Sequence, residues 1–363
     1  MIWSIIGYVV PFITVLSLVV FFHELGHFLI GRWCGVRADV FSLGFGPELF
    51  GFNDRYGTHW RLAAFPLGGY VKFHGESTTE PQDLSVSFSA QNVWKRAAIV
   101  AAGPIANFLL AMILFTGIFY VSGRPILLPT VDGVAVGSTA EAAGFHVNDL
   151  ILSIGGVKVN SFEEVQRIVQ TSVDTELVFT IERDSTVVEI IATPHRHDIV
   201  TEFGTVRLAG LGVQSKGKLE NWHTQHYDLI SSARLAGSET WYIIERTGGY
   251  IKGLIAGQES PDQISGPIRI AEVSGAMAQL GIAPLLNLAA IMSISVGLLN
   301  LFPIPLLDGG YLFYYGVEAV RGKVVSNKVQ DFGFKIGIMF IATLMILATY
   351  NDILRLTSKL NWG

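Results

Sequence analysis

Long uncharged runs alternate with polar segments along this chain. The 20 residues from Trp3 to Phe22 carry no charged side chain and would form a helix of about 30 Å, enough to cross a bilayer. Further uncharged runs cover residues 97–123, 273–307 and 336–350. The pattern predicts four membrane-spanning helices. A cleaved signal peptide is the alternative for the first run, but no basic segment precedes it and no A-x-A-like site follows it.

The segment between the second and third runs, residues 124–279, has the pattern of a soluble region. Residues 149–154 and 176–182 alternate as strands do, and Gly155-Gly156 predicts a turn. Ser161 followed by Glu164 is a capping box, which predicts a helix over residues 161–170. Residues 221–255 mix apolar and polar positions at helical spacing, which fits either an interfacial amphipathic helix or a helix packed on the soluble region.

Composition supports a membrane protein. Charged residues make up 15% of the 363 residues, against about 25% in soluble proteins. The net charge is −5 and no basic cluster is visible, which argues against nucleic acid as a partner. The single cysteine, Cys34, excludes an intramolecular disulfide and a zinc site built from several thiolates.

The positive charges of the short loops predict the orientation. They gather between the first and second runs and between the third and fourth, at Arg32, Arg37, Arg55, Arg61, Lys72, Lys95, Arg96, Arg321, Lys323, Lys328 and Lys335. Because such loops stay cytoplasmic, both termini and residues 124–279 are expected on the outer side.

An H-E-x-x-H motif, His23-Glu24-Leu25-Gly26-His27, follows the first run directly. On a helix, positions i and i+4 share one face, so His23 and His27 could bind one zinc ion while Glu24 holds a zinc-bound water. Ionisable side chains near membrane depth are costly without a partner, and this favours a functional cluster.

A catalytic zinc site needs a third protein ligand, for which Asp308 is the candidate. It ends the third run, in a segment broken by two prolines and followed by two glycines, and three spans would bring it to the same side as His27. The alternative is an aspartate that caps a following helix. Two imidazoles and a carboxylate could also hold another divalent ion, as in non-haem iron sites.

Residues 133–170, GVAVGSTAEAAGFHVNDLILSIGGVKVNSFEEVQRIVQ, resemble a PDZ domain in the alanine-rich turn, the G-x-x-x-x-D-x-I pattern and the Gly-Gly hairpin. A PDZ fold takes an extended peptide onto a sheet edge, which predicts capture or screening of a polypeptide end. A compact β-rich domain with a purely spatial role is the alternative.

Taken with HELGH, three further motifs resemble the site-2 protease family of the bacterial RseP type: PLGGYVKF at residues 66–73, AGPIANF at 102–108 and NLFPIPLLDGG at 300–310. The resemblance implies an α-helical polytopic membrane protein with four transmembrane helices, a membrane-associated β-loop and an inserted β-rich PDZ domain. It also implies an intramembrane zinc metalloprotease of the bacterial inner membrane, with both termini and the PDZ domain periplasmic. Expected substrates are transmembrane segments of single-pass proteins, such as a pre-cleaved anti-sigma factor or remnant signal peptides, in regulated intramembrane proteolysis.

The same resemblance assigns roles by position. His23, His27 and Asp308 match the Zn²⁺ ligands, and Glu24 matches the general base. Asn300 matches an asparagine that steadies substrate. The β-loop at residues 66–73, with Gly69, Tyr70 and Val71, matches a strand that pairs with unwound substrate. Enterobacterial relatives carry two PDZ domains where this chain shows one.

The expected domain order follows from the runs and motifs. It is residues 1–30, first transmembrane helix with H-E-x-x-H; 31–96, cytoplasmic and membrane-associated β-rich loop; 97–123, second transmembrane helix; 124–198, periplasmic PDZ domain; 199–279, periplasmic linker with an amphipathic helix; 280–310, third transmembrane helix with the LDG motif; 311–335, cytoplasmic loop; 336–352, fourth transmembrane helix; and 353–363, C-terminal tail.

Two other classes of function remain possible from the sequence. A membrane-anchored PDZ adaptor with a non-catalytic metal site is one, although such a site would not need Glu24 beside its ligands. A transporter is the other, although no internal repeat is visible.

Overall fold

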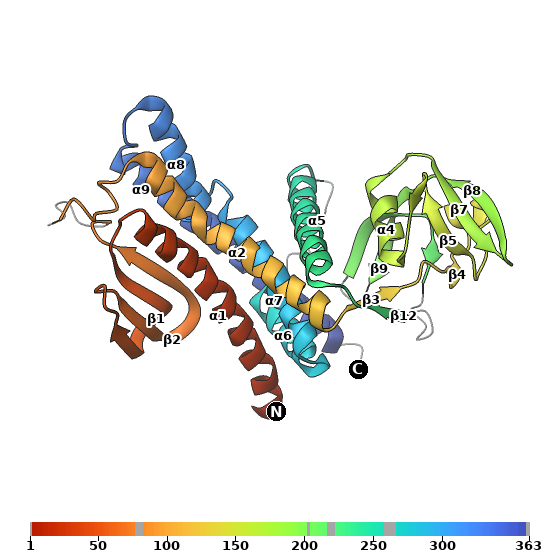
Figure 1. Ribbon diagram of the computed structural model, residues 1–363, viewed down its shortest axis with the longest axis horizontal. Coiled ribbons are helices and arrows are strands. Elements are labelled where there is room, and N and C mark those ends of the chain that lie inside the picture. The colour runs from red at the N-terminus through yellow and green to blue at the C-terminus, as the bar shows by residue number, and fades with distance from the viewer. Residues whose placement is uncertain (1, 77–82, 202–203, 216–221, 258–265, 361–363) are drawn as a thin grey trace. The chain divides into compact units, whose positions relative to one another are not determined.

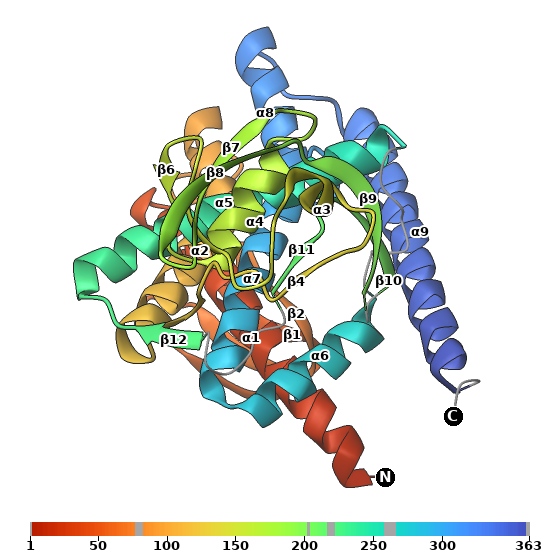
Figure 2. The same cartoon turned by 90° about the vertical axis from the view of Figure 1, so that its right-hand side faces the viewer.

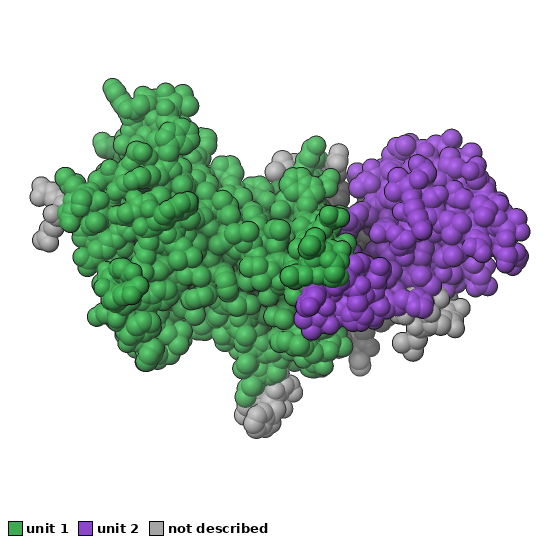
Figure 3. All heavy atoms as spheres, in the orientation of Figure 1, with its two compact units in different colours: residues 1–118, 228–256, 264–363 green, residues 119–227, 257–263 purple. Residues whose placement is uncertain are grey.

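The computed structural model describes residues 2–76, 83–201, 204–215, 222–257 and 266–360. Residues 361–363 of the expected tail, residues 77–82 of the expected β-rich loop, and residues 202–203, 216–221 and 258–265 of the expected linker lie outside this description. The chain divides into two compact units (Figure 3). The helical unit comprises residues 1–118, 228–256 and 264–363, and the β-rich unit comprises residues 119–227 and 257–263.

The helical unit is built from α1 (Ile2–Trp33), α2 (Val93–Val121), α5 (Leu229–Ile255), α6 (Pro267–Leu280), α7 (Ile282–Asn300), α8 (Asp308–Arg321) and α9 (Asn327–Leu360) (Figure 1). Four helical stretches are long and apolar enough to cross a bilayer: Ile6–Trp33, Val93–Val121, Ile282–Asn300 and Asn327–Arg355. The four predicted spans are therefore confirmed, and the chain is a multi-pass membrane protein.

Small residues let α1, α2 and α7 approach one another closely. A Cβ atom on Gly26 of α1 would lie 2.3 Å from the carbonyl oxygen of Ala102 in α2. A Cβ on Gly297 of α7 would lie 3.1 Å from the carbonyl oxygen of Pro104. Lipid tails are as apolar as the helices, so close packing of this kind, rather than the hydrophobic effect, holds transmembrane helices together.

A polar contact joins α6 to α9. Asp352 of α9 is buried and accepts hydrogen bonds from the backbone amides of Gly266, at 3.1 Å, and Arg269, at 2.9 Å. These amides belong to the first turn of α6, where the helix itself offers no acceptor. Asp352 therefore caps α6 from a helix far away in the sequence.

Two long curved strands, β1 (Ala38–Asn53) and β2 (His59–Phe73), lie against α1 (Figure 1). The first part of β1 pairs with both ends of β2, since Val40 lies opposite both His59 and Lys72. Residues 69–73 consequently have β1 on one side only. Phe28 of α1 packs with Phe41 and Phe73 of the two strands in a buried cluster that fixes this sheet to the helix.

The β-rich unit contains β3 (Arg124–Leu127), β4 (Gly133–Val134), α3 (Thr139–Ala143), β5 (Leu150–Ile154), β6 (Val157–Lys158), α4 (Phe162–Thr171), β7 (Leu177–Arg183), β8 (Thr186–Ala192), β9 (His195–Thr201), β10 (Gly204–Gly210), β11 (Val213–Gln214) and β12 (Trp222–Gln225). Strands β6, β5, β7 and β8 form an antiparallel sheet in that order, and β9 pairs with β10 in a ribbon (Figure 2).

Local predictions for this unit are confirmed. The Ser161 hydroxyl accepts a hydrogen bond from the Glu164 backbone amide at 3.2 Å and so caps α4. The Glu164 carboxylate accepts a hydrogen bond from the backbone amide of Asn160, one residue before the cap. Gly155 and Gly156 have φ values of 58° and 79°, as the predicted turn between β5 and β6 requires. In the helical unit, α5 covers residues 229–255 of the segment 221–255 expected to be helical, and Asp228 caps it. The expectation is wrong for residues 222–225, which form β12.

Candidate metal centre

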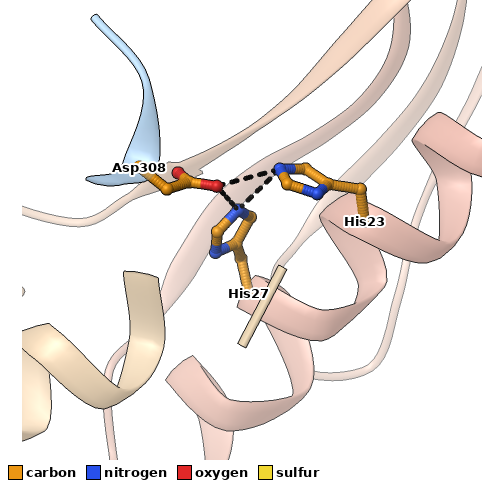
Figure 4. A group of neighbouring side chains, drawn as sticks. All are labelled: His23, His27 and Asp308. Carbon is orange, nitrogen blue, oxygen red and sulfur yellow. Dashed lines mark hydrogen bonds and ion pairs between the residues drawn. The ribbon is translucent and has the colours of Figure 1, made fainter. Parts of the chain in front are cut away.

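His23 and His27 lie one turn apart on α1, and their rings converge beside the Asp308 carboxylate (Figure 4). Their Nε2 atoms are 3.2 Å apart, and both residues are buried, with 8% of their surface exposed. The helix carries both ligands without distortion, because side chains four residues apart lie above each other on one face. The spacing of the motif alone therefore sets the first two corners of the site.

Asp308 comes to these histidines from the far end of the chain. Its Oδ2 atom is 3.1 Å from His23 Nε2 and 3.5 Å from His27 Nε2 (Figure 4). Leu307, and not Asp308, is the N-cap of α8, so Asp308 does not act as a helix cap. The carboxylate is therefore available to the histidines.

The glycines after Asp308 allow the chain to turn sharply at this point. A Cβ on Gly309 would lie 2.2 Å from the carbonyl oxygen of Phe302, and one on Gly310 would lie 2.4 Å from that of Ile304. Leu306, just before the turn, has a φ of 103°, a strained value for a residue with a side chain. The strain and the two glycines together place the carboxylate beside α1.

The three ligand atoms fit a zinc ion. Bonds of about 2.0–2.2 Å in a tetrahedral site place ligand atoms roughly 3.3–3.5 Å apart. The separations here are 3.1, 3.2 and 3.5 Å. Asp308 Oδ2 is buried and has the two Nε2 atoms as ion-pair partners, so a cation shared by the three atoms would replace protons held between them. A donor set of two imidazoles and one carboxylate with a free fourth position is that of catalytic zinc sites.

Gly103 of α2 provides the room for both imidazoles. A Cβ at this position would lie 2.3 Å from His27 Nε2 and 2.9 Å from His23 Cε1. In addition, the backbone carbonyl of Ile99 lies 2.9 Å from His27 Nδ1 and can fix the orientation of that ring. Neither role was predicted from the sequence, although Gly103 stands in the AGPIANF segment that carried the family resemblance.

All the sequence-predicted site residues line one cavity of about 940 Å³ in the helical unit. They are His23, Glu24, His27, Gly69, Tyr70, Val71, Asn300 and Asp308. The backbone amide of Val71 donates a hydrogen bond to the Glu24 carboxylate. Asn300 Nδ2 lies 3.4 Å from His23 Nε2. The structure therefore brings together residues as distant in the sequence as His23 and Asp308, which are 285 positions apart.

The edge of β2 that lines this cavity is paired with no second strand among the described residues. The amide of Val71 bonds to Glu24, and the amide of Phe73 donates to Glu76 Oε2 at 3.1 Å. Backbone groups alternate in direction along a strand, so Tyr70 and Lys72 direct theirs toward β1. The free edge of residues 69–73 thus faces the cavity that holds His23, His27 and Asp308.

Comparison with known proteins supplies the family context. Residues 11–344 match the family described as "Peptidase family M50". A protein of Agrobacterium fabrum that bears the name of a zinc metalloprotease is 44% identical over 360 residues, covering 96% of each chain. A zinc-metalloprotease relative of Rhizobium meliloti is 42% identical and covers 95% of this chain and 96% of its own. The metalloprotease MmpA of Caulobacter vibrioides is 35% identical and covers 96% of this chain and 97% of its own.

Among solved structures, the PDZ domain of an SdrC-like protein from Listeria monocytogenes is similar to a part of this chain. The matched region covers 23% of this chain and 82% of the solved chain, with 20% sequence identity and a TM-score of 0.19.

Proposed function

The chain belongs to peptidase family M50 and is a membrane-embedded zinc metalloprotease, and we propose that it hydrolyses peptide bonds within transmembrane segments of single-pass membrane proteins. The observation that carries this proposal is that His23 and His27 lie within an apolar helix long enough to span a bilayer. This stretch runs from Ile6 to Trp33, and His23 lies ten residues, or about 15 Å, before its end. A scissile bond that reaches these side chains lies beside a membrane-spanning helix.

His23, His27 and Asp308 would hold the Zn²⁺ ion, with Nε2, Nε2 and Oδ2 as ligand atoms. When bound, zinc supplies a Lewis acid that polarises the substrate carbonyl and lowers the pKa of a coordinated water towards about 7. Glu24 is the general base: its carboxylate accepts a proton from water and passes it to the departing amide nitrogen.

The free edge of β2 would hold the substrate. A helical substrate hides its carbonyl groups in intrahelical hydrogen bonds and must unwind before attack. Residues 69–73 can take over those bonds by adding the substrate as a further strand, with Gly69, Tyr70 and Val71 in contact with it. Gly69 leaves space here, since a Cβ would lie 3.1 Å from Glu24 Cγ. Asn300, at the end of α7, would steady the substrate beside His23.

The biological setting is proposed from the family resemblance and the charge pattern. The positive loop residues favour a bacterial inner-membrane protein with both termini and the β-rich unit in the periplasm. There the β-rich unit, as a PDZ domain, would screen a polypeptide end. A pre-cleaved anti-sigma factor and remnant signal peptides are the substrate classes, in regulated intramembrane proteolysis. The adaptor alternative loses its support, because the family and the named relatives are metalloproteases.

Cleavage of a single-pass test protein with a shortened outer part tests this proposal. Wild type and Glu24→Gln are compared after both are shown to hold equal zinc. We expect wild type to cleave and the variant to be about 10²–10⁴-fold slower, the usual contribution of a general base. Equal rates would remove Glu24 from the mechanism. If neither cleaves while both hold zinc, capture of the test protein by Glu24→Gln decides whether this substrate binds the cavity at all.

A further inference from the structure

Asn107 of α2 lies at the ring edge of His23 that carries Nδ1, whereas Asp308 lies at Nε2. Its side-chain amide is 3.2 Å from His23 Nδ1, while His23 Nε2 is 3.1 Å from Asp308 Oδ2. Asn107 is fully buried, at 0% exposure. An asparagine is rarely placed in such surroundings unless its hydrogen bonds are made.

The protonation of His23 decides whether it can bind a metal. A neutral imidazole carries one proton, so a free lone pair on Nε2 requires the proton on Nδ1, and Nδ1–H then needs an acceptor. For His27 the acceptor is the backbone carbonyl of Ile99, 2.9 Å from Nδ1. For His23, the polar group within hydrogen-bond distance on that side is the Asn107 amide.

The orientation of this amide carries the argument. As placed, its nitrogen faces His23 Nδ1, and its oxygen is buried without a hydrogen-bond partner among the described residues. Amide nitrogen and oxygen are assigned from their hydrogen bonds, and a rotation of 180° exchanges them. The rotated amide directs Oδ1 at His23 Nδ1, so the unpartnered oxygen gains a donor and Nε2 is left with a free lone pair.

Helix α7 fixes the backbone of Asn107. The Ser293 hydroxyl donates to the Asn107 carbonyl oxygen at 2.8 Å, and both residues are fully buried. Gly297, one turn further along α7, allows the close approach, because a Cβ there would lie 3.2 Å from Asn107 Cβ. The amide is therefore presented to His23 from a rigid contact between two helices.

We propose that Asn107 is a positioning residue for the metal centre: its Oδ1 accepts the Nδ1–H of His23 and so holds the tautomer whose Nε2 can bind zinc. The inference rests on the proposed role of His23 as a ligand. Asn107 and the Ile99 carbonyl then act alike, one on each histidine. Such partners of ligand histidines commonly change metal affinity by about 10–100-fold when they are removed.

Zinc affinity of the full-length protein in detergent, measured by competition with a chromophoric chelator, tests the proposal without any assay of activity. Asn107→Leu and Asn107→Ala remove the acceptor, and we expect each to bind zinc about 10–100-fold more weakly. Asn107→Asp keeps an oxygen acceptor, and we expect its affinity to stay within a few-fold of wild type. Thr116→Val, which removes a hydroxyl from the same helix, is the matched control and should bind as wild type does.

Two further measurements separate the possible failures. Thermal unfolding of the zinc-free proteins shows whether a variant is folded, and either acceptor-free variant that folds gives the readout. His23→Ala tests the underlying site: if it binds zinc as tightly as wild type does, the proposed function fails. If His23→Ala loses zinc but the acceptor-free variants bind normally, or if Asn107→Asp binds no better than Asn107→Leu, the role of Asn107 is wrong.

Discussion

Two carboxylates, Asp149 in the β-rich unit and Asp308 in the helical unit, have different surroundings. Asp149 of the β-rich unit accepts hydrogen bonds from Arg183 Nε and Nη2, each at 2.7 Å, and from the His146 backbone amide at 2.8 Å. Asp308 of the helical unit faces His23 and His27, whose Nε2 atoms lie 3.1 and 3.5 Å from its buried Oδ2. The first carboxylate is held by an arginine that is always charged, whereas the second faces two imidazoles that can release their protons to a metal.

The comparison shows two uses of a carboxylate: one stabilises the fold, and the other can bind a metal. A buried ion pair with a full set of hydrogen bonds holds strands and loops together, and removal of one partner destabilises the fold. A carboxylate beside two imidazoles can instead exchange the protons that they share for a metal ion. Loss of Asp308 should therefore affect chemistry, and loss of Asp149 should affect stability.

The largest effect is expected for Asp308→Ala. Without the third ligand the site should lose zinc and the protease activity should fall by roughly 10³-fold or more, the scale of losing metal-assisted hydrolysis together with its general base. Thermal unfolding of the zinc-free variant should still show a folded protein. Metal analysis and calorimetry of purified protein check both. A folded variant with full zinc content would contradict the assignment of Asp308.

Gly103→Ala tests whether the histidines need the space that α2 leaves. The added methyl group would lie 2.3 Å from His27 Nε2, so the ring must move and zinc affinity should fall by about 10-fold or more. Gly117→Ala on the same helix is the matched control, because a Cβ there would meet no described atom within 4 Å beyond its chain neighbours and the nearby backbone of its own helix. Equal zinc affinity of the two variants would contradict the packing described here.

Asp149→Ala should leave the zinc content unchanged and destabilise the β-rich unit. The change leaves Arg183 without its carboxylate, and breaking a buried ion pair costs about 3–5 kcal/mol. Since Arg183 is partly exposed, the lower end of that range is expected. Hydrogen exchange at the amides of β5 and β7 in the full-length protein measures the effect. Protection equal to that of wild type would show that the pair is dispensable.

A smaller effect is expected from pH on the same pair. Burial raises the pKa of Asp149, but the hydrogen bonds from Arg183 and from the His146 amide outweigh it and hold the pKa below its usual value. The folded state therefore binds this proton less readily than the unfolded state. The stabilisation is present above the unfolded pKa of about 4 and is lost as the pH falls below it. Exchange at β5 and β7 should rise in that range for wild type and change less for Asp149→Asn.

The sequence contained enough to predict the spans and the candidate ligand set. Uncharged runs fix the four spans because the bilayer demands about 20 apolar residues, and the four-residue spacing fixes His23 and His27 on one helical face. Asp308 follows from the number of spans that separate it from His27 and from the broken backbone around it. These features depend on local pattern and on a simple count.

The remaining contacts depend on how separate helices meet. The roles of Gly103 and Asn107 arise only because α2 lies against the motif face of α1 and against α7, and no local pattern encodes that approach. The pairing of one part of β1 with both ends of β2 likewise requires a bend, at Gly44 and Gly46, that residue alternation does not reveal. Long-range contacts of this kind specified the surroundings of the ligands, while local sequence specified the ligands.

The most direct test of the central claim is the position of the bond that this protease cuts. Wild-type protein is incubated with a single-pass test protein in lipid vesicles, and mass spectrometry of the two fragments gives the scissile bond, with Glu24→Gln as the control. The depth of His23, His27 and Asp308 predicts a cut inside the apolar segment of the substrate, absent with the variant. A cut confined to the water-exposed part of the substrate would contradict hydrolysis within the membrane.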